Sequence, residues 1–141
     1  MELSHSQSEL VRVLARMAGY HLQQNPDFPV TGAQMNRAGQ VGLCKPSGLQ
    51  ADAPLQHRIE VLLTAFRSAA ESGEVTACAY SAPVTVKHPK NGEEGPCILV
   101  SCEAEDGEAV DVFVPFARNP ALNLGTPFFV TRTGQIFKPG S

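Results

Sequence analysis

The chain has 141 residues, of which 43% are hydrophobic and 18% are charged, as in an ordinary folded domain and unlike a disordered segment. The formal net charge is -3 and the lysines and arginines are scattered, which argues against a nucleic-acid or anionic-membrane surface. No stretch approaches the roughly 18 apolar residues of a membrane span. The start, Met1 to Ser4, lacks the basic and apolar parts of a secretory signal. We therefore expect a single cytoplasmic domain, residues 1–141, with neither nucleic acid nor membrane as a partner.

Apolar residues recur at helical spacing near the start of the chain and predict an amphipathic helix. Ser6, followed three residues later by Glu9, fits a capping box at the helix start. Pro26 ends the helix, because proline cannot continue the hydrogen-bonding pattern. The apolar stripe consists of Leu10, Val13, Leu14, Met17, Ala18 and Leu22.

Two short strands are expected next, over residues 28–33 and 40–44. Between them, residues 36–39 begin with asparagine and end with glycine, which is typical of a hairpin turn. Pro29 favours an edge strand or a late strand start, because proline has no N–H to donate. Residues 45–51 form a polar connector.

The second helix has the clearest signals. Asp52 is the expected N-cap and Pro54 falls in the first turn, where a missing N–H is harmless. Gly73 is the expected stop after the helix. The predicted buried face consists of Leu55, Ile59, Leu62, Leu63 and Phe66.

The remainder of the chain has the pattern of extended strands. Residues 75–86 are followed by a polar loop, and residues 97–104 and 110–116 flank an Asp-Gly turn, which is a strong hairpin signal. A final strand is expected within residues 127–130, with 135–137 as a candidate continuation. The predicted fold is α+β, with order α-β-β-α-β-β-β and a mainly antiparallel five-stranded sheet carrying two amphipathic helices.

Three segments carry a resemblance to a known family: residues 74–77 (EVTA), 106–116 (DGEAVDVFVPF) and 125–129 (GTPFF). On these segments the chain resembles a family of small uncharacterised bacterial proteins, and the likeness extends from the first helix to the last strand. The resemblance implies a fold but no catalytic motif. The element order is also similar to that of roadblock and profilin-like folds, although roadblock domains usually end in a third helix.

The four cysteines are Cys44, Cys78, Cys97 and Cys102, and we expect them to be free thiols in the core. Cys97 and Cys102 fall in one predicted strand, on opposite faces and roughly 16 Å apart at about 3.3 Å per residue, which is too far for a disulfide. A metal site of His57, Cys78 and Cys102 is conceivable if the two cysteines share a sheet face. A shift of one residue in register would separate them, and plain core cysteines are the favoured interpretation.

Acidic side chains offer two further candidates. Glu103, Glu105, Asp106 and Glu108 are expected to form a solvated hairpin tip, with a paired-carboxylate site as the alternative. Asp111 interrupts a valine-rich strand and is expected to face solvent together with Phe113, although an acid beside an exposed aromatic can also mark a contact surface. Because Gly-x-Ser-x-Gly, Cys-x-x-Cys and phosphate-loop motifs are lacking, no catalytic, cofactor-binding or metal-binding residue is predicted.

Three classes of function remain, in order of preference. The first is a non-enzymatic interaction or regulatory module, a homodimer or a partner of another protein, that uses a sheet edge or a helix face. The second is a small-ligand-binding protein with a pocket between helix and sheet. The third is an enzyme whose site is assembled from dispersed residues.

Overall fold

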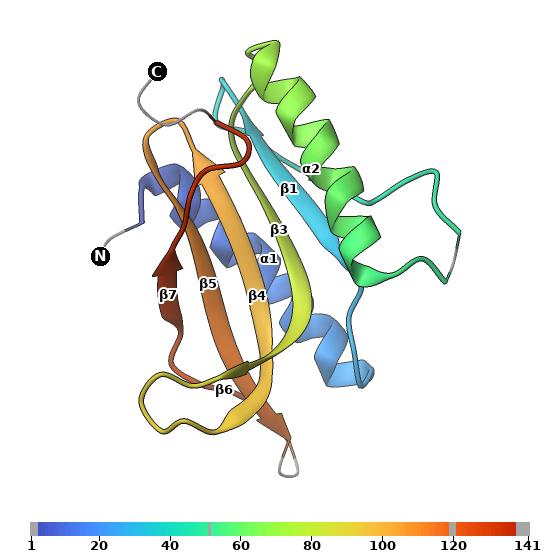
Figure 1. Cartoon of the computed structure of the whole chain (residues 1–141), viewed down its shortest axis with the longest axis vertical. Coiled ribbons are helices and arrows are strands. Elements are labelled where there is room, and N and C mark those ends of the chain that lie inside the picture. The colour runs from blue at the N-terminus through green and yellow to red at the C-terminus, as the bar shows by residue number, and fades with distance from the viewer. Residues whose placement is uncertain (1–2, 51, 119–120, 138–141) are drawn as a thin grey trace.

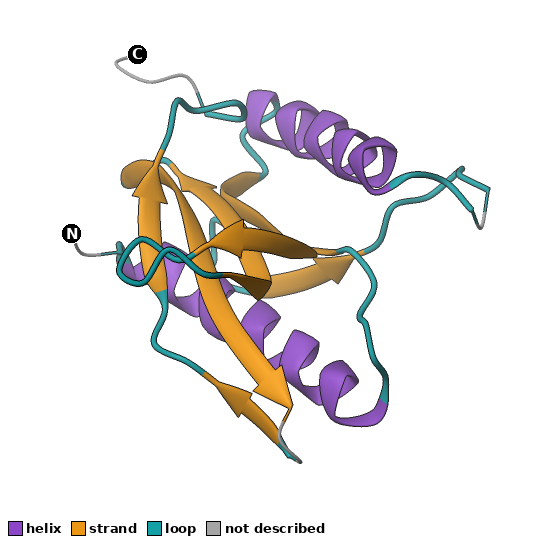
Figure 2. Ribbon diagram, turned by 60° about the horizontal axis from the view of Figure 1, so that its bottom comes forward, coloured by secondary structure: helices purple, strands orange, loops and turns teal. Residues whose placement is uncertain are grey.

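Two helices lie on opposite faces of one twisted antiparallel sheet, as the computed structural model shows (Figures 1 and 2). The structure describes residues 3–50, 52–118 and 121–137. The elements in chain order are α1 (His5–Gln24), β1 (Thr31–Asn36), β2 (Val41–Cys44), α2 (Leu55–Glu71), β3 (Val75–Lys87), β4 (Glu94–Ala104), β5 (Gly107–Arg118), β6 (Leu122–Leu124) and β7 (Phe128–Thr131).

The α+β class, the helix–strand order and the antiparallel sheet predicted from the sequence are confirmed. The sheet has seven strands in the order β2-β1-β3-β4-β5-β6, and β7 also pairs with β5. The predicted count of five strands is two too low. It leaves out the final strand expected within residues 127–130, which is β7, and it lacks β6, whose three residues are too few to show an alternating pattern. β1 begins only at Thr31, after Pro29, in agreement with a late strand start. The candidate continuation at 135–137 is not a strand.

Helix α1 begins two residues earlier than predicted. Its capping box joins Ser4 and Gln7: the Ser4 hydroxyl accepts the Gln7 N–H at 3.2 Å, and the Gln7 side-chain oxygen accepts the Ser4 N–H at 3.0 Å. Gln7 is buried, and its side-chain nitrogen donates to the carbonyl of Glu108 on β5. The prediction of Ser6 and Glu9 was wrong because glutamine fills the third helical position as well as glutamate does.

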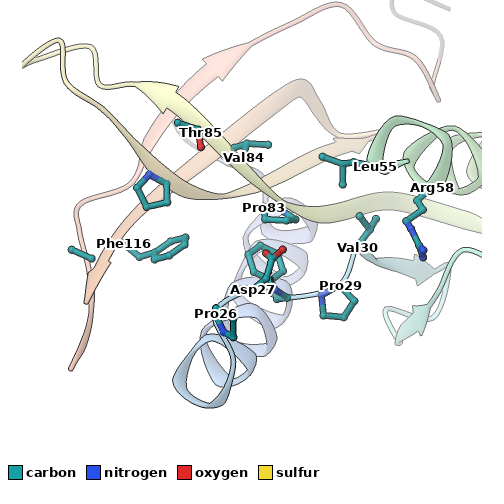
Figure 3. Close-up of a pocket in the computed structure, with 13 residues that line it drawn as sticks. Pro26, Asp27, Pro29, Val30, Leu55, Arg58, Pro83, Val84, Thr85 and Phe116 are labelled. Atoms are coloured by element: carbon teal, nitrogen blue, oxygen red, sulfur yellow. Dashed lines mark hydrogen bonds between the residues drawn. The ribbon is translucent and has the colours of Figure 1, made fainter. Parts of the chain in front are cut away.

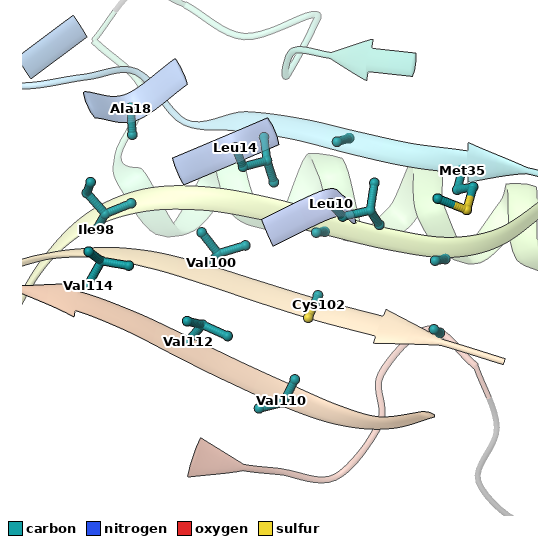
Figure 4. Packing of buried hydrophobic residues seen from close by; sticks show 14 of the residues in the cluster. Leu10, Leu14, Ala18, Met35, Ile98, Val100, Cys102, Val110, Val112 and Val114 are labelled. Atoms are coloured by element: carbon teal, nitrogen blue, oxygen red, sulfur yellow. The ribbon is translucent and has the colours of Figure 1, made fainter. Parts of the chain in front are cut away.

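The core on the α1 side joins this helix to the middle of the sheet. Leu10, Leu14 and Ala18 project from α1 onto Val100 of β4 and Val112 of β5 (Figure 4). Leucines four residues apart reach the same face, so one stripe of the helix covers several strands. The valines at 110, 112 and 114 share this face, as their alternation predicted.

The core on the α2 side is smaller. Phe66 is 1% exposed and packs among Ile59, Leu62 and Leu63 of the same helix against β3. Leu55, predicted on this buried face, is 37% exposed because it stands at the very first residue of α2. Asp52 is not the N-cap, since Pro54 occupies that position without a side-chain hydrogen bond. Gly73 follows the helix with a φ of 78°, a left-handed conformation that favours glycine.

In the described part of the chain, no helix is both long and apolar enough to cross a lipid bilayer.

Candidate ligand-binding site

A pocket of about 920 Å³ opens where five segments of the chain meet at one end of the sheet. The connector from α1 to β1 supplies residues 26–30, and the first turn of α2 supplies Leu55 and Arg58. The remaining walls are residues 83–85 of β3, Pro96 of β4 and residues 116–117 of β5. The pocket therefore lies between α2 and the sheet (Figure 3).

The lining is mainly apolar and includes four prolines, at positions 26, 29, 83 and 96. Proline has a fixed φ and no N–H, so these residues make the backbone of the wall stiff and leave it with few hydrogen-bond donors for a ligand. Phe116 lies at one end of the group of side chains and Arg58 at the other (Figure 3). A ligand that spans the pocket therefore meets an aromatic ring at one end and a cation at the other.

The connector is held in place by side chains that enter both cores. Phe28 is 5% exposed and belongs to the α1-side core, whereas Val30, 6% exposed, belongs to the α2-side core. Residues two apart on a regular strand would share a face, but the connector is not a strand at this point, and its backbone turns so that the two side chains anchor it from both sides of the sheet. This wall of the pocket is thereby formed in advance of any ligand.

Two charged side chains line the pocket with defined contacts. The Arg58 Nε donates to the carbonyl of Ala53 at 3.0 Å, which ties the guanidinium to the start of α2. Asp27 accepts the N–H of Phe28 at 2.9 Å. The polar groups at the pocket are therefore few and oriented, as is usual for sites that bind small molecules.

A second hollow of about 390 Å³ shares Pro96, Phe116 and Ala117 with the first, and it contains both His88 and Cys97. The two do not form an activated thiol. Burial raises the pKa of the Cys97 thiol, and this thiol donates to the Gly95 carbonyl at 3.9 Å. His88 accepts the N–H of Lys90 on Nδ1 at 3.1 Å, and its ring packs edge-on against Phe128.

Glu103 is not at a solvated hairpin tip, which corrects the expectation from the sequence. It is 2% exposed on the α2 side of β4, and its carboxylate lies 2.8 Å from Nη1 of Arg132. It also accepts the backbone N–H groups of Gln135, Ile136 and Phe137. All these partners of the carboxylate belong to residues 132–137, the segment that follows β7. This segment covers Glu103, which the sequence predicts to be exposed to solvent.

Asp111 does not face solvent as predicted. Its side chain is 25% exposed and lies 2.9 Å from Nε of Arg132, and it accepts a hydrogen bond from the Ser101 hydroxyl at 2.6 Å. Burial works to lower the pKa of Arg132, but the hydrogen bonds and charges of Glu103 and Asp111 outweigh it and raise that pKa. Glu103, Asp111, Arg132 and Ser101 form one hydrogen-bonded network, which Tyr80 joins through Ser101.

The composite site of His57, Cys78 and Cys102 is not formed. The register pairs Ala79 with Cys102, so Cys78 lies on the opposite face and belongs to the α2-side core, whereas Cys102 belongs to the α1-side core. Among the residues that the structure describes, no group of three or more histidine, cysteine or acidic side chains can hold a metal ion. All four cysteines are free, and burial raises the pKa of Cys78 and of Cys102 to about 12.

Comparison with known proteins returned no match to a family model, a curated protein or a solved structure. The resemblance to small bacterial proteins stays an expectation from the sequence.

Proposed function

We propose that this protein is a non-enzymatic binding module that takes a small, mainly apolar molecule into the pocket between α2 and the sheet. The observation that carries the proposal is the pocket itself: about 920 Å³, within the size range of small-molecule sites, with a lining dominated by proline, valine, leucine and phenylalanine. This reverses the order preferred from the sequence, in which a ligand pocket ranked behind an interaction module.

The charges at the pocket narrow the ligand class. Arg58 lies at the end opposite Phe116 (Figure 3), and an anionic end on an apolar ligand would be attracted to its guanidinium. Asp27 also lines the pocket and disfavours a second negative group. The ligand class proposed is therefore an apolar molecule with one anionic end.

Two dyes test the pocket and the charge separately: anilinonaphthalene sulfonate, which is apolar and anionic, and Nile red, which is apolar and neutral. Ala117 is exposed and lines the pocket, so A117W places a large ring there with little effect on the core. We expect A117W to weaken both dyes about tenfold. R58Q should weaken the anionic dye alone.

The matched control is A38W, which adds the same ring at an exposed alanine in the β1–β2 turn, away from the pocket. Circular dichroism on each variant shows whether it is folded. If A117W and A38W bind both dyes as tightly as the wild type, the pocket is not the binding site and the proposal fails.

A further inference from the structure

The strand β7 lies at the edge of the sheet, and nothing in the described part of the chain pairs with its outer side (Figure 1). β6 and β7 both run antiparallel to β5 along the same edge, so together they form one interrupted strand. Between β6 and β7, Pro127 and a shift in register make the edge unsuitable for pairing with another strand. β7 itself, with sequence Phe-Phe-Val-Thr, carries neither a charge nor a proline.

The register settles which backbone groups point outward. The Arg132 N–H donates to the carbonyl of Ala109 on β5, so these two residues form a hydrogen-bonded pair. Hydrogen-bonded and non-hydrogen-bonded pairs alternate along an antiparallel ladder. Val130 therefore bonds to β5, whereas the N–H and C=O groups of Phe129 and Thr131 point away from it.

The side chains along this edge are apolar and accessible. Val130 is 49% exposed, Phe129 is 44% exposed, and Leu124 on β6 is 49% exposed. Val130 lies on the α2 side of the sheet, opposite Asp111, and Phe129 lies on the α1 side, opposite Val112. An edge with open hydrogen-bonding groups and apolar side chains on both faces is a template for another strand.

We propose that β7 pairs with β7 of a second copy of this chain, antiparallel about a two-fold axis at Val130. In this register the outward groups of Phe129 bond to those of Thr131 in the second copy, and the reverse, which gives four hydrogen bonds. The two Val130 side chains then meet as a non-hydrogen-bonded pair, in which side chains lie closest.

Charge favours a second copy as the occupant. The pairing sets each Arg132 beside Phe128 of the other copy and not beside the second Arg132. Each Arg132 is already paired with Glu103 and Asp111, so the contact brings no uncompensated charge to the edge. A strand that is uncharged and self-complementary gives a closed, isologous dimer.

The experiment is sedimentation of the full chain over a range of concentrations. The wild type should sediment at twice the chain mass, and V130K should shift it to one chain mass. T131P should do the same, because it removes only an outward N–H and leaves the ladder to β5 intact. The control L43K adds the same charge at an exposed leucine of the opposite edge strand, β2, and should leave the dimer unchanged.

A crosslink tests the register. V130C, in a background where Cys44 is serine, should form an intermolecular disulfide on oxidation, because facing residues of a non-hydrogen-bonded pair lie about 4.5 Å apart, within disulfide range. L43C in the same background should not. A wild type that is monomeric at every concentration, or a dimer that L43K dissociates and V130K does not, overturns the proposal. Dye binding is independent of this result, so failure here leaves the proposed pocket standing.

Discussion

At the scale of single residues, the most consequential side chain outside the pocket is Glu103. Its carboxylate binds one guanidinium and three backbone N–H groups, and it is almost completely buried. Removing one partner of a buried ion pair leaves the other charge poorly solvated, and this costs more than the pair contributes when it is intact. Glu103 therefore holds the segment after β7 against the sheet.

We predict that E103Q lowers the free energy of unfolding by about 3 kcal/mol, because it leaves Arg132 without one of its two carboxylates. Urea denaturation followed by circular dichroism measures the change. The matched variant is E105Q, whose carboxylate forms an exposed pair with Arg37 at 2.8 Å. It should cost less than about 1 kcal/mol. Equal losses in the two variants would show that Glu103 contributes no more than a surface charge.

The sequence could not separate Glu103 from Glu105. The two glutamates lie two residues apart beside the same Asp-Gly turn, and acids next to such a turn are usually solvated. The partners that bury Glu103 come from residues 132–137, which no local pattern connects to β4. Asp111 was misjudged for the same reason, since its partner is also Arg132.

At the scale of elements, α2 approaches β1 at a glycine. A Cβ on Gly32 would lie 2.8 Å from the Cys44 sulfur and 2.9 Å from the Phe66 ring, closer than real contacts allow. Glycine at position 32 therefore lets α2 pack closely against β1, beside the Cys44 side chain of β2.

We predict that G32A destabilises the protein by about 1–3 kcal/mol, the usual effect of overpacking a core. The control is G42A on the neighbouring strand β2, where an added Cβ meets nothing within 4 Å. That change should be neutral or slightly stabilising, because alanine has less freedom to lose than glycine. Thermal melting of both variants decides the matter: a G32A protein as stable as G42A would mean that α2 shifts freely.

Periodicity predicted the elements well where the element was long. The two helices are predicted because their apolar residues repeat over about three turns each, and the long strands are predicted by alternation and the Asp-Gly turn. The ends were less certain: Ser4 caps α1 with Gln7, and the chain offered Ser6 with Glu9 as an equally good pattern. β6 was missed because three residues carry no period, and it is defined by its pairing with β5 alone.

At the scale of the whole molecule, each core contains one thiol with a strongly raised pKa: Cys78 on the α2 side and Cys102 on the α1 side. In the unfolded chain a cysteine ionises near pH 9, whereas in the folded protein it keeps its proton to about pH 12. Between these values the unfolded state holds fewer protons, so the free energy of unfolding falls as the pH rises.

We predict that this fall is shallower when a buried thiol is removed. C78A and C102A should each reduce the slope of stability against pH, between about pH 9 and 11, by on the order of 1 kcal/mol per pH unit. Urea midpoints measured at several pH values give the slope. C44A is the comparison: Cys44 is only partly buried and burial raises its pKa less, so this variant should change the slope less than the other two. Slopes identical to the wild type in both buried variants would contradict the prediction.

The pocket lies beyond prediction from sequence for a simple reason. Its walls come from residues 26–30, 55, 58, 83–85, 96 and 116–117, and each of these segments has an ordinary local interpretation as a linker, a helix start or a strand. Only the placing of α2 and the connector at the same end of the sheet makes them neighbours. The class of a pocket between helix and sheet could be anticipated, but its residues could not.

The connector with Phe28 and Val30 couples the unfolding of the two cores. The chain that leaves α1 is fastened into one core and, two residues later, into the other. If either helix separates from the sheet, the connector loses its packing in that core, and this connector also forms the pocket wall. We expect the α1-side and α2-side cores to unfold together in a single all-or-none transition. A ligand bound in the pocket should stabilise both cores against unfolding.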